Sequence, residues 1–154
     1  MYDGDIIDPH HHLWDLTSGW YPWLTTDRPD EMVFGDPAPL ARDYMIPDYL
    51  ADWSGLSLVK SVHISAALAS ADATAETRWL QRLADAHGFP HGIVAGAALE
   101  HPDAEQSLEA QAEFANVRGI RQIVSWHENP SFNFCERSDI MADAEWRNGF
   151  SKLN

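Results

Sequence analysis

The chain has 154 residues, enough for one domain with its own hydrophobic core, and its 45% hydrophobic content is typical of a globular protein. Its formal net charge of -14 would repel nucleic-acid phosphates, which argues against a nucleic-acid partner. The sequence has no basic cluster for an anionic lipid surface and no apolar run approaching the roughly 18 residues that cross a bilayer. Composition therefore predicts neither nucleic-acid nor membrane binding.

Cysteine usage bears on the compartment. Cys135 is the one cysteine in the sequence, so no intrachain disulfide can form. The N-terminus has no basic region followed by an apolar run, as a secretory signal would. We therefore expect a reducing, cytoplasmic location.

The first predicted strand covers residues 5–13 and contains a run of three histidines. Because side chains alternate along a strand, Asp8, His10 and His12 should share one face, and His11 should lie on the other. Imidazole is a common zinc ligand, so His10 and His12 are predicted to converge on one metal ion or one substrate. Asp8 could orient one of the two rings, and His11 is expected to support or pack. The alternative is a polar histidine run that binds nothing.

An irregular, Pro-rich segment follows, over residues 14–43. Insertions of this length inside a compact domain are usually functional. The segment is rich in aromatic side chains, namely Trp14, Trp20, Tyr21 and Trp23. They either cover a substrate pocket, with Trp14 and Trp23 as contacts, or form a small core for the segment itself.

Regular alternation of helices and strands begins at residue 46. The predicted elements are a helix over 46–54, a strand over 60–67, a helix over 71–87, a strand over 92–99, a helix opened by Pro102, a strand over 117–126, and a last helix capped at 138–139. Strands that are continuously apolar and alternate with helices predict a parallel sheet covered by helices. The fold class is therefore α/β.

Two further histidines are candidates for substrate binding. Ligands of parallel α/β domains bind at the carboxyl ends of the strands, and His127 follows the strand over 117–126. His127 is thus expected at the same end as His10 and His12, unless it is a solvated loop residue. His63 lies within a strand, where it either contacts substrate or belongs to the core.

Arg121 and Gln122 are unusual in an apolar strand, and alternation requires one of them to face the interior. An inward Arg121 would bind a substrate carboxylate or an oxyanion. It could equally pair with a buried acid as part of the structure.

Several segments together resemble the amidohydrolase-related branch of the amidohydrolase superfamily, and within it the lactonase-like proteins that act on sugar lactones and related cyclic esters. The segments that carry the resemblance are Ile7-Asp8-Pro9-His10-His11-His12-Leu13-Trp14-Asp15-Leu16, Tyr21-Pro22-Trp23-Leu24, Glu76-Thr77-Arg78-Trp79-Leu80, Gly92-Ile93-Val94-Ala95, Val117-Arg118-Gly119-Ile120-Arg121-Gln122-Ile123 and Trp126-His127-Glu128-Asn129-Pro130.

The resemblance implies a (β/α)8 barrel with His10 and His12 at the end of its first strand. Further histidines and an aspartate would come from later strands. Water or hydroxide, activated by a metal or by that acid, would open the ring. Some lactonase relatives use a divalent metal, which here would be zinc or manganese, and others work without one.

The resemblance also sets an expectation about size. A barrel of this kind takes about 250 residues, so we expect residues 1–154 to form its N-terminal half, about four β/α units, truncated on the C-terminal side. The predicted function of the parent protein is hydrolysis of a small lactone or cyclic ester. Two alternatives are a metal-dependent decarboxylase with the same barrel, and an inert half-barrel that needs a partner half or a second copy.

Overall fold

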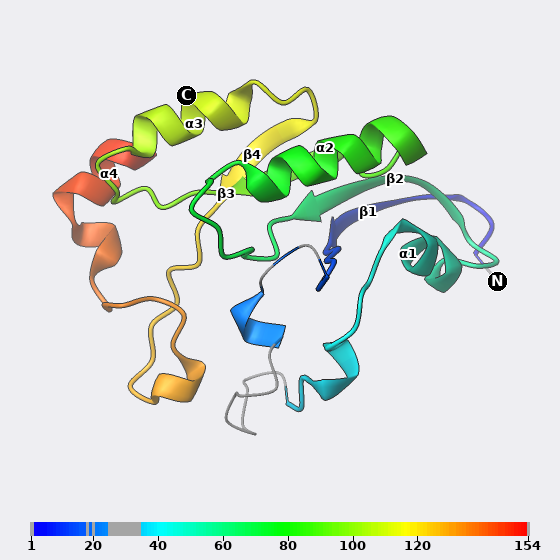
Figure 1. Cartoon of the computed structure of the whole chain (residues 1–154), viewed down its shortest axis with the longest axis horizontal. Coiled ribbons are helices and arrows are strands. Elements are labelled where there is room, and N and C mark those ends of the chain that lie inside the picture. Colours follow the sequence, from blue (N-terminus) through cyan, green and yellow to red (C-terminus); the bar gives the residue numbers. More distant parts are fainter. Residues whose placement is uncertain (1, 18, 20, 25–34, 154) are drawn as a thin grey trace.

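The computed structural model describes residues 2–17, 19, 21–24 and 35–153. In these residues one sheet of four parallel strands runs in chain order, β1 (Asp5–His11), β2 (Ser57–Ile64), β3 (Gly92–Gly96) and β4 (Val117–Arg121) (Figure 1). The predicted parallel α/β sheet is confirmed. Within the described chain, β1 and β4 each have a strand neighbour on one side only, so both are edge strands.

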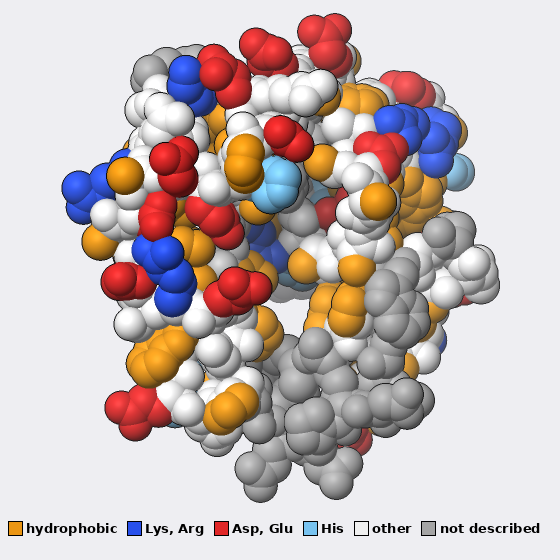
Figure 2. Space-filling view, turned by 60° about the vertical axis from the view of Figure 1, so that its left-hand side comes forward, with side chains coloured by type: hydrophobic (Ala, Val, Ile, Leu, Met, Phe, Trp, Pro, Cys, Tyr) orange, Lys and Arg blue, Asp and Glu red, His pale blue; other side chains and the backbone are white. Residues whose placement is uncertain are grey.

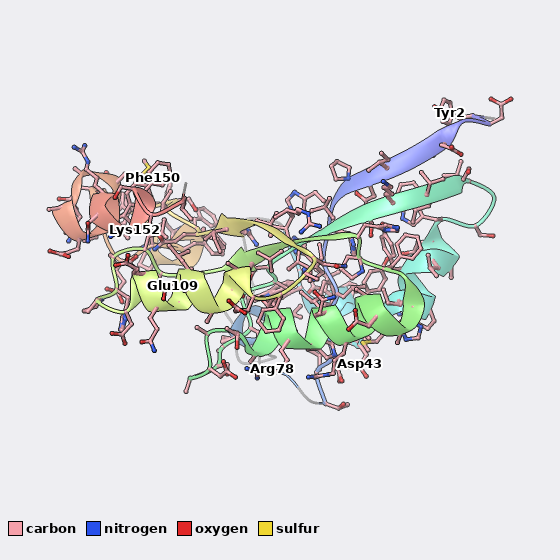
Figure 3. All side chains as sticks on the ribbon, turned by 90° about the horizontal axis from the view of Figure 1, so that it is seen from above. Tyr2, Asp43, Arg78, Glu109, Phe150 and Lys152 are labelled. Carbon is pink, nitrogen blue, oxygen red and sulfur yellow. The ribbon has the colours of Figure 1, made fainter. Side chains whose placement is uncertain are left out.

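The helices are α1 (Ile46–Asp52), α2 (Ala75–His87), α3 (Ala104–Ala112) and α4 (Ala144–Phe150), with short 3-10 turns at Pro22–Leu24, Ala38–Leu40, Pro130–Phe132 and Ile140–Ala142. Helices α2 and α3 lie side by side along one face of the sheet (Figures 1 and 3). Helix α2 ends where predicted, because Gly88 takes a left-handed conformation at φ +77° that other residues rarely adopt.

The strands end earlier than the apolar runs that predicted them. Beyond β2 and β3 the chain leaves the sheet, and side chains replace neighbouring strands as hydrogen-bond partners of the backbone. The N–H of Ala66 donates to Glu76, and the N–H of Leu99 donates to Gln122. Hydrophobicity reports burial rather than strand pairing, which explains the overlong predictions.

The main core lies where β1 and β3 meet α1 and α2. Its buried members are Leu13, Ile46, Tyr49, Leu80, Ile93 and Ala95. A second, smaller cluster belongs to the irregular segment and comprises Trp14, Tyr21, Leu24 and Ala66. This confirms that part of the segment packs as a core of its own, and backbone bonds between Trp14 and Tyr44 tie it to the chain before α1. Trp20 lies outside the described residues.

The last helix differs from its prediction. Asp143, rather than residues 138–139, caps α4, and its carboxylate accepts from the N–H groups of Glu145 and Trp146. Phe150 at the end of this helix is 54% exposed. Trp146 anchors the helix instead, through an indole N–H that donates to Gln122 Oε1 at 2.9 Å. In the described chain, no helix is both long and apolar enough to span a membrane.

Gly149 allows α4 to approach the backbone that follows β3. A Cβ at this position would lie 2.0 Å from the carbonyl oxygen of Leu99. Gly149→Ala should therefore force α4 outward and lower the free energy of unfolding by about 1–3 kcal/mol, despite the better helix propensity of alanine. Urea denaturation measures the change, with exposed Asn148→Ala as the neighbouring control. Equal stability of Gly149→Ala and the wild type would contradict this account of the packing.

Candidate active site at the strand ends

His10 and His12 converge at the end of β1, as the sequence predicts. Their Nε2 atoms lie 3.3 Å apart, and the two rings meet edge to face. Nδ1 of His12 lies 2.7 Å from the carbonyl oxygen of Ile64, which can only accept, so Nδ1 carries the proton. Burial lowers the pKa of His12 below its ordinary value, because it disfavours the charged form of the ring. Nε2 of His12 therefore presents a lone pair toward His10.

Asp8 does not share this face in the way that simple alternation predicts. The pairing of β1 with β2 is irregular between Asp8 and His11, so the order of side chains along β1 is broken there. The Asp8 carboxylate accepts from the hydroxyl of Tyr49 at 2.8 Å and from the backbone N–H of His10 at 3.1 Å. The carboxylate therefore holds the backbone of the histidine run, and its hydrogen bonds go to neither the His10 ring nor the His12 ring.

His11 and His63 are buried beneath the site. Nε2 of His11 lies 3.0 Å from Ser61 Oγ, its ring stacks on Tyr49, and burial lowers its pKa to about 4. His63 is fully buried, and its Nε2 accepts from the N–H of Leu13 at 2.9 Å. His11 is thus packed in the interior, one of the two positions expected for it. The prediction that His63 contacts the substrate does not agree with its burial, because a ring with no exposed surface cannot reach a ligand. His63 belongs to the core instead.

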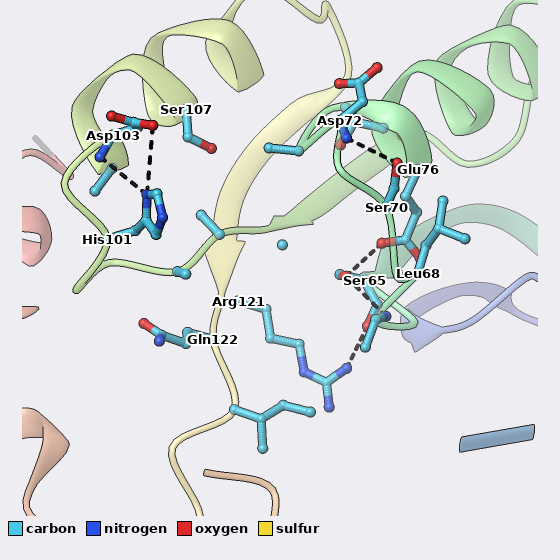
Figure 4. A pocket seen from close by; sticks show the side chains of 18 of the residues that line it. Ser65, Leu68, Ser70, Asp72, Glu76, His101, Asp103, Ser107, Arg121 and Gln122 are labelled. Atoms are coloured by element: carbon cyan, nitrogen blue, oxygen red, sulfur yellow. Dashed lines mark hydrogen bonds and ion pairs between the residues drawn. The ribbon is translucent and has the colours of Figure 1, made fainter. Parts of the chain in front are cut away.

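Arg121 and Gln122 divide between two environments. Arg121 points inward from the end of β4 and donates through Nη1 to the carbonyl oxygen of Ser65 (Figure 4). Gln122 turns the other way and joins the chain after β3 to α4. The inward residue is therefore Arg121, and its direct hydrogen bond in the structure goes to a backbone carbonyl.

A cavity of about 870 Å³ brings together side chains from the ends of β1 and β4, the irregular segment and the loop after β4. Six of the residues that line it are His12, Trp14, Trp23, Leu40, Arg121 and Phe134. The rings of Trp14 and Trp23 meet edge to face, with centroids 5.5 Å apart. Both tryptophans therefore form part of the small core and of the cavity wall, which joins the two predicted roles. Figure 2 shows a hollowed face with acidic side chains above it and to its left.

A second cavity, of about 570 Å³, adjoins the first at Arg121 and opens between the loops before α2 and α3 (Figure 4). Ser65, Glu76 and Gln122 are among the residues that line it. Arg121 thus stands between an aromatic cavity and a more polar one.

His127 lines neither cavity. It is exposed, its ring packs edge to face on Phe132, and its Nδ1 accepts from the N–H of Asn129. Because β4 ends at Arg121 rather than near residue 126, the following loop separates His127 from the strand end. Substrate binding by His127 stays a prediction.

Glu76 is the site residue that the sequence predictions missed. An acidic residue in the first turn of a helix usually faces solvent, yet Glu76 is only 8% exposed. Its carboxylate accepts from Ser65 Oγ and from the N–H of Ala66. Burial raises its pKa above the ordinary value, although both hydrogen bonds and the nearby Arg121 charge act in the opposite direction. Glu76 lies four residues before buried Leu80, on the same face of the helix, and this spacing is the signal that could have revealed its burial.

The residues fit a metal ion in part. Two nitrogens bound to one tetrahedral zinc at about 2.0–2.1 Å would be about 3.3–3.4 Å apart, which matches the Nε2 separation in His10 and His12. In the residues that the structure describes, no third histidine, cysteine, aspartate or glutamate joins them. The pair therefore supplies two ligands of a site rather than a full set.

The chain belongs to the amidohydrolase family, since the model of that family matches residues 7–149. It is 42% identical over 153 residues to the uncharacterized protein y4mH of Sinorhizobium fredii, covering 99% of this chain and 51% of that protein.

Solved structures show the same fold. An amidohydrolase from Burkholderia multivorans with bound zinc has a TM-score of 0.64 at 24% identity, over 96% of this chain and 44% of that one. Amidohydrolase 2 from Bifidobacterium longum subsp. infantis has a TM-score of 0.62 at 18% identity, over 97% and 47%. The chain thus spans about half the length of these relatives, and its four β/α units match half of an amidohydrolase TIM barrel, which confirms the predicted fold.

Buried His63 should make the stability of the chain pH-dependent. Its pKa lies well below 6.5 in the folded state and near 6.5 when unfolded, so the unfolded state binds more protons as pH falls. The contribution to stability is complete above pH 6.5 and declines below it by about 1.4 kcal/mol per pH unit. Urea denaturation between pH 7.5 and pH 5 measures this slope.

The control is His63→Gln, which keeps an acceptor near the position of Nε2 for the N–H of Leu13 but does not titrate. We expect a slope smaller by about 1.4 kcal/mol per pH unit in this variant. Identical slopes in the two proteins would show that His63 titrates normally.

Proposed function

We propose that this chain supplies one side of the active site of a hydrolase that opens a small lactone or similar cyclic ester by attack of water. Membership in the amidohydrolase family, the paired histidines and the adjoining aromatic cavity support the proposal. Cys135, the one thiol of the sequence, is buried, donates to the carbonyl of Arg137, and is not among the residues that line either cavity. Water is therefore the proposed nucleophile.

The 3.3 Å separation of the Nε2 atoms of His10 and His12 is the observation that carries the proposal. We propose that both atoms ligate a divalent metal, zinc or manganese. The similar amidohydrolase structure from Burkholderia multivorans has bound zinc. When bound, such a metal polarises an ester carbonyl and makes water more acidic. The bond from Nδ1 of His12 to Ile64 holds the ring in the orientation and tautomer that ligation needs.

The other residues would act on the substrate. Arg121 donates one N–H to Ser65, and its guanidinium lines both cavities, where it would bind a carboxylate or polar group of the substrate. Trp14 and Trp23 would pack on the ring and exclude bulk water. His127 would contact the substrate only from the loop after β4.

We also propose that residues 1–154 are part of a larger domain. The relatives are about twice as long, and both edge strands of the described sheet have one side without a strand. A second half of the barrel, or a second copy of the chain, would then supply the remaining ligands and the catalytic acid. The cytoplasm remains the proposed compartment, on the strength of the single cysteine.

Metal binding tests the central claim. The chain should bind zinc. His10→Ala and His12→Ala should each weaken the zinc affinity by more than the roughly 10- to 100-fold that follows loss of a residue hydrogen-bonded to a metal ligand. Competition with a zinc-binding chromophore measures the affinity, and a pH indicator follows ring opening of sugar lactones with and without zinc or manganese.

His87→Ala is the matched control, because His87 is exposed at the end of α2, away from the cavities. It should leave zinc affinity unchanged. Zinc binding that survives both His10→Ala and His12→Ala would show that these residues are not ligands, and the proposed function would lose its main support.

The role of Arg121 predicts a selective kinetic effect. Arg121→Met should raise KM for a carboxylate-bearing lactone by about 10- to 100-fold, as expected for loss of a hydrogen bond to a charged group, and should change KM for a neutral lactone much less. Steady-state kinetics with both substrates, on the chain assembled with the half or copy that completes the site, measure the difference. Arg118→Ala, on the same strand but exposed, is the control. An equal rise in KM for both lactones would argue against a carboxylate contact.

A further inference from the structure

Three consecutive carbonyl groups hold three of the predicted site residues. The carbonyl oxygens of Ile64, Ser65 and Ala66 accept, in that order, from Nδ1 of His12, Nη1 of Arg121 and Nε1 of Trp23. The His12 and Trp23 bonds are both 2.7 Å long. The segment 64–66 is therefore a common support for a proposed metal ligand, a proposed substrate-binding cation and a wall of the cavity.

This support lies where β2 ends, so strand pairing secures it only in part. The N–H of Ser65 still donates to Val94 on β3. The next residues turn away, and Ala67 takes a φ of +60°, a left-handed conformation that a residue with a Cβ rarely adopts. Such a turn persists only where neighbouring groups hold it.

Glu76 is the group that holds it. One carboxylate oxygen accepts from Ser65 Oγ at 2.6 Å, and the other accepts from the N–H of Ala66 at 2.8 Å. Ser65 Oγ in turn accepts from the N–H of Ala67 at 3.2 Å. The ionised carboxylate has only hydrogen-bond acceptors, so it can accept from the Ser65 hydroxyl and from the Ala66 N–H at the same time. Because Glu76 belongs to α2, its carboxylate connects the helix layer directly to segment 64–66.

The buried carboxylate faces the same segment as the Arg121 guanidinium. Figure 4 shows Arg121 and Glu76 reaching Ser65 from opposite sides. Glu76 is 8% exposed, and taking a carboxylate out of water is unfavourable unless hydrogen bonds and nearby positive charge offset the loss of hydration. A hydrophobic residue would pack this helix face without that cost, so packing alone does not explain a glutamate here.

We propose that Glu76 is a positioning residue: by holding segment 64–66 it orients His12, Arg121 and Trp23 together, and so sets the affinity of the site for a divalent cation. Glu76 touches neither the cation nor the substrate in this arrangement. The part that concerns the cation rests on the proposed function, whereas the orientation of His12 does not.

The test uses the whole chain and compares Glu76→Ala with Glu76→Gln. Leu83→Ala is the matched control, because Leu83 packs against the core from the same helix, whereas the hydrogen bonds to segment 64–66 come from Glu76. Nitrogen-15 NMR without metal reports whether Nδ1 or Nε2 of His12 carries the proton. Zinc affinity is measured by chromophore competition.

We expect Glu76→Ala to reduce the Nδ1-protonated form of His12 and to weaken zinc binding by about 10- to 100-fold, as loss of an outer partner does at metal sites. Glu76→Gln, which keeps an acceptor for Ala66, should remain within about threefold of the wild type, since the geometry of the contact persists. Leu83→Ala should keep both the tautomer and the zinc affinity, although it destabilises the core.

A wild-type tautomer and zinc affinity in Glu76→Ala would overturn the proposal, and so would an equal loss of affinity in Leu83→Ala. If the wild-type chain binds no zinc, the proposed function fails, and the His12 tautomer alone then decides the role of Glu76. If Glu76→Ala does not fold, Ser65→Ala removes one of the two contacts, and an unchanged His12 tautomer in that variant would equally overturn the proposal.

Discussion

The hydrogen bond from Nδ1 of His12 to the carbonyl oxygen of Ile64 is the contact on which the site depends. It joins the end of β1 to the end of β2 and decides which imidazole nitrogen keeps its lone pair. Because that nitrogen then faces His10 at 3.3 Å, the bond turns two neighbouring histidines into a pair of candidate ligands. The partner is a backbone atom, so the bond depends on the path of the chain rather than on one side chain.

Neutral and charged groups are distributed unequally around this contact. The buried histidines His11 and His63 have lowered pKa values because burial disfavours their charged forms, so they support the site as neutral rings. Arg121 brings positive charge to the cavities of a protein whose formal net charge is -14. An anionic or polar substrate group would therefore find attraction at this point within a surface that is otherwise largely acidic.

The fold places the site at the open end of a partial barrel. Four strands and their helices match half of an amidohydrolase TIM barrel, and the described sheet has an edge at β1 and another at β4. The histidine pair lies at the end of the edge strand β1, and Arg121 is the last residue of the edge strand β4. The candidate site is thus bounded by β1 and β4, the two outer strands of the described sheet.

Local patterns determined much of this protein. Alternation along one strand predicts the convergence of His10 and His12, continuous apolar runs predict the parallel sheet, and both depend only on neighbouring residues. The sequence did not reveal the turned-away carboxylate of Asp8 or the contact of Glu76 with segment 64–66, and it left open whether His63 belongs to the core and whether His127 lies in a solvated loop. Each of these depends on a bulge, on a strand end or on a partner from a distant element. Such features are decided when helices and strands pack, because hydrogen bonds between distant segments leave no periodic signal along the chain.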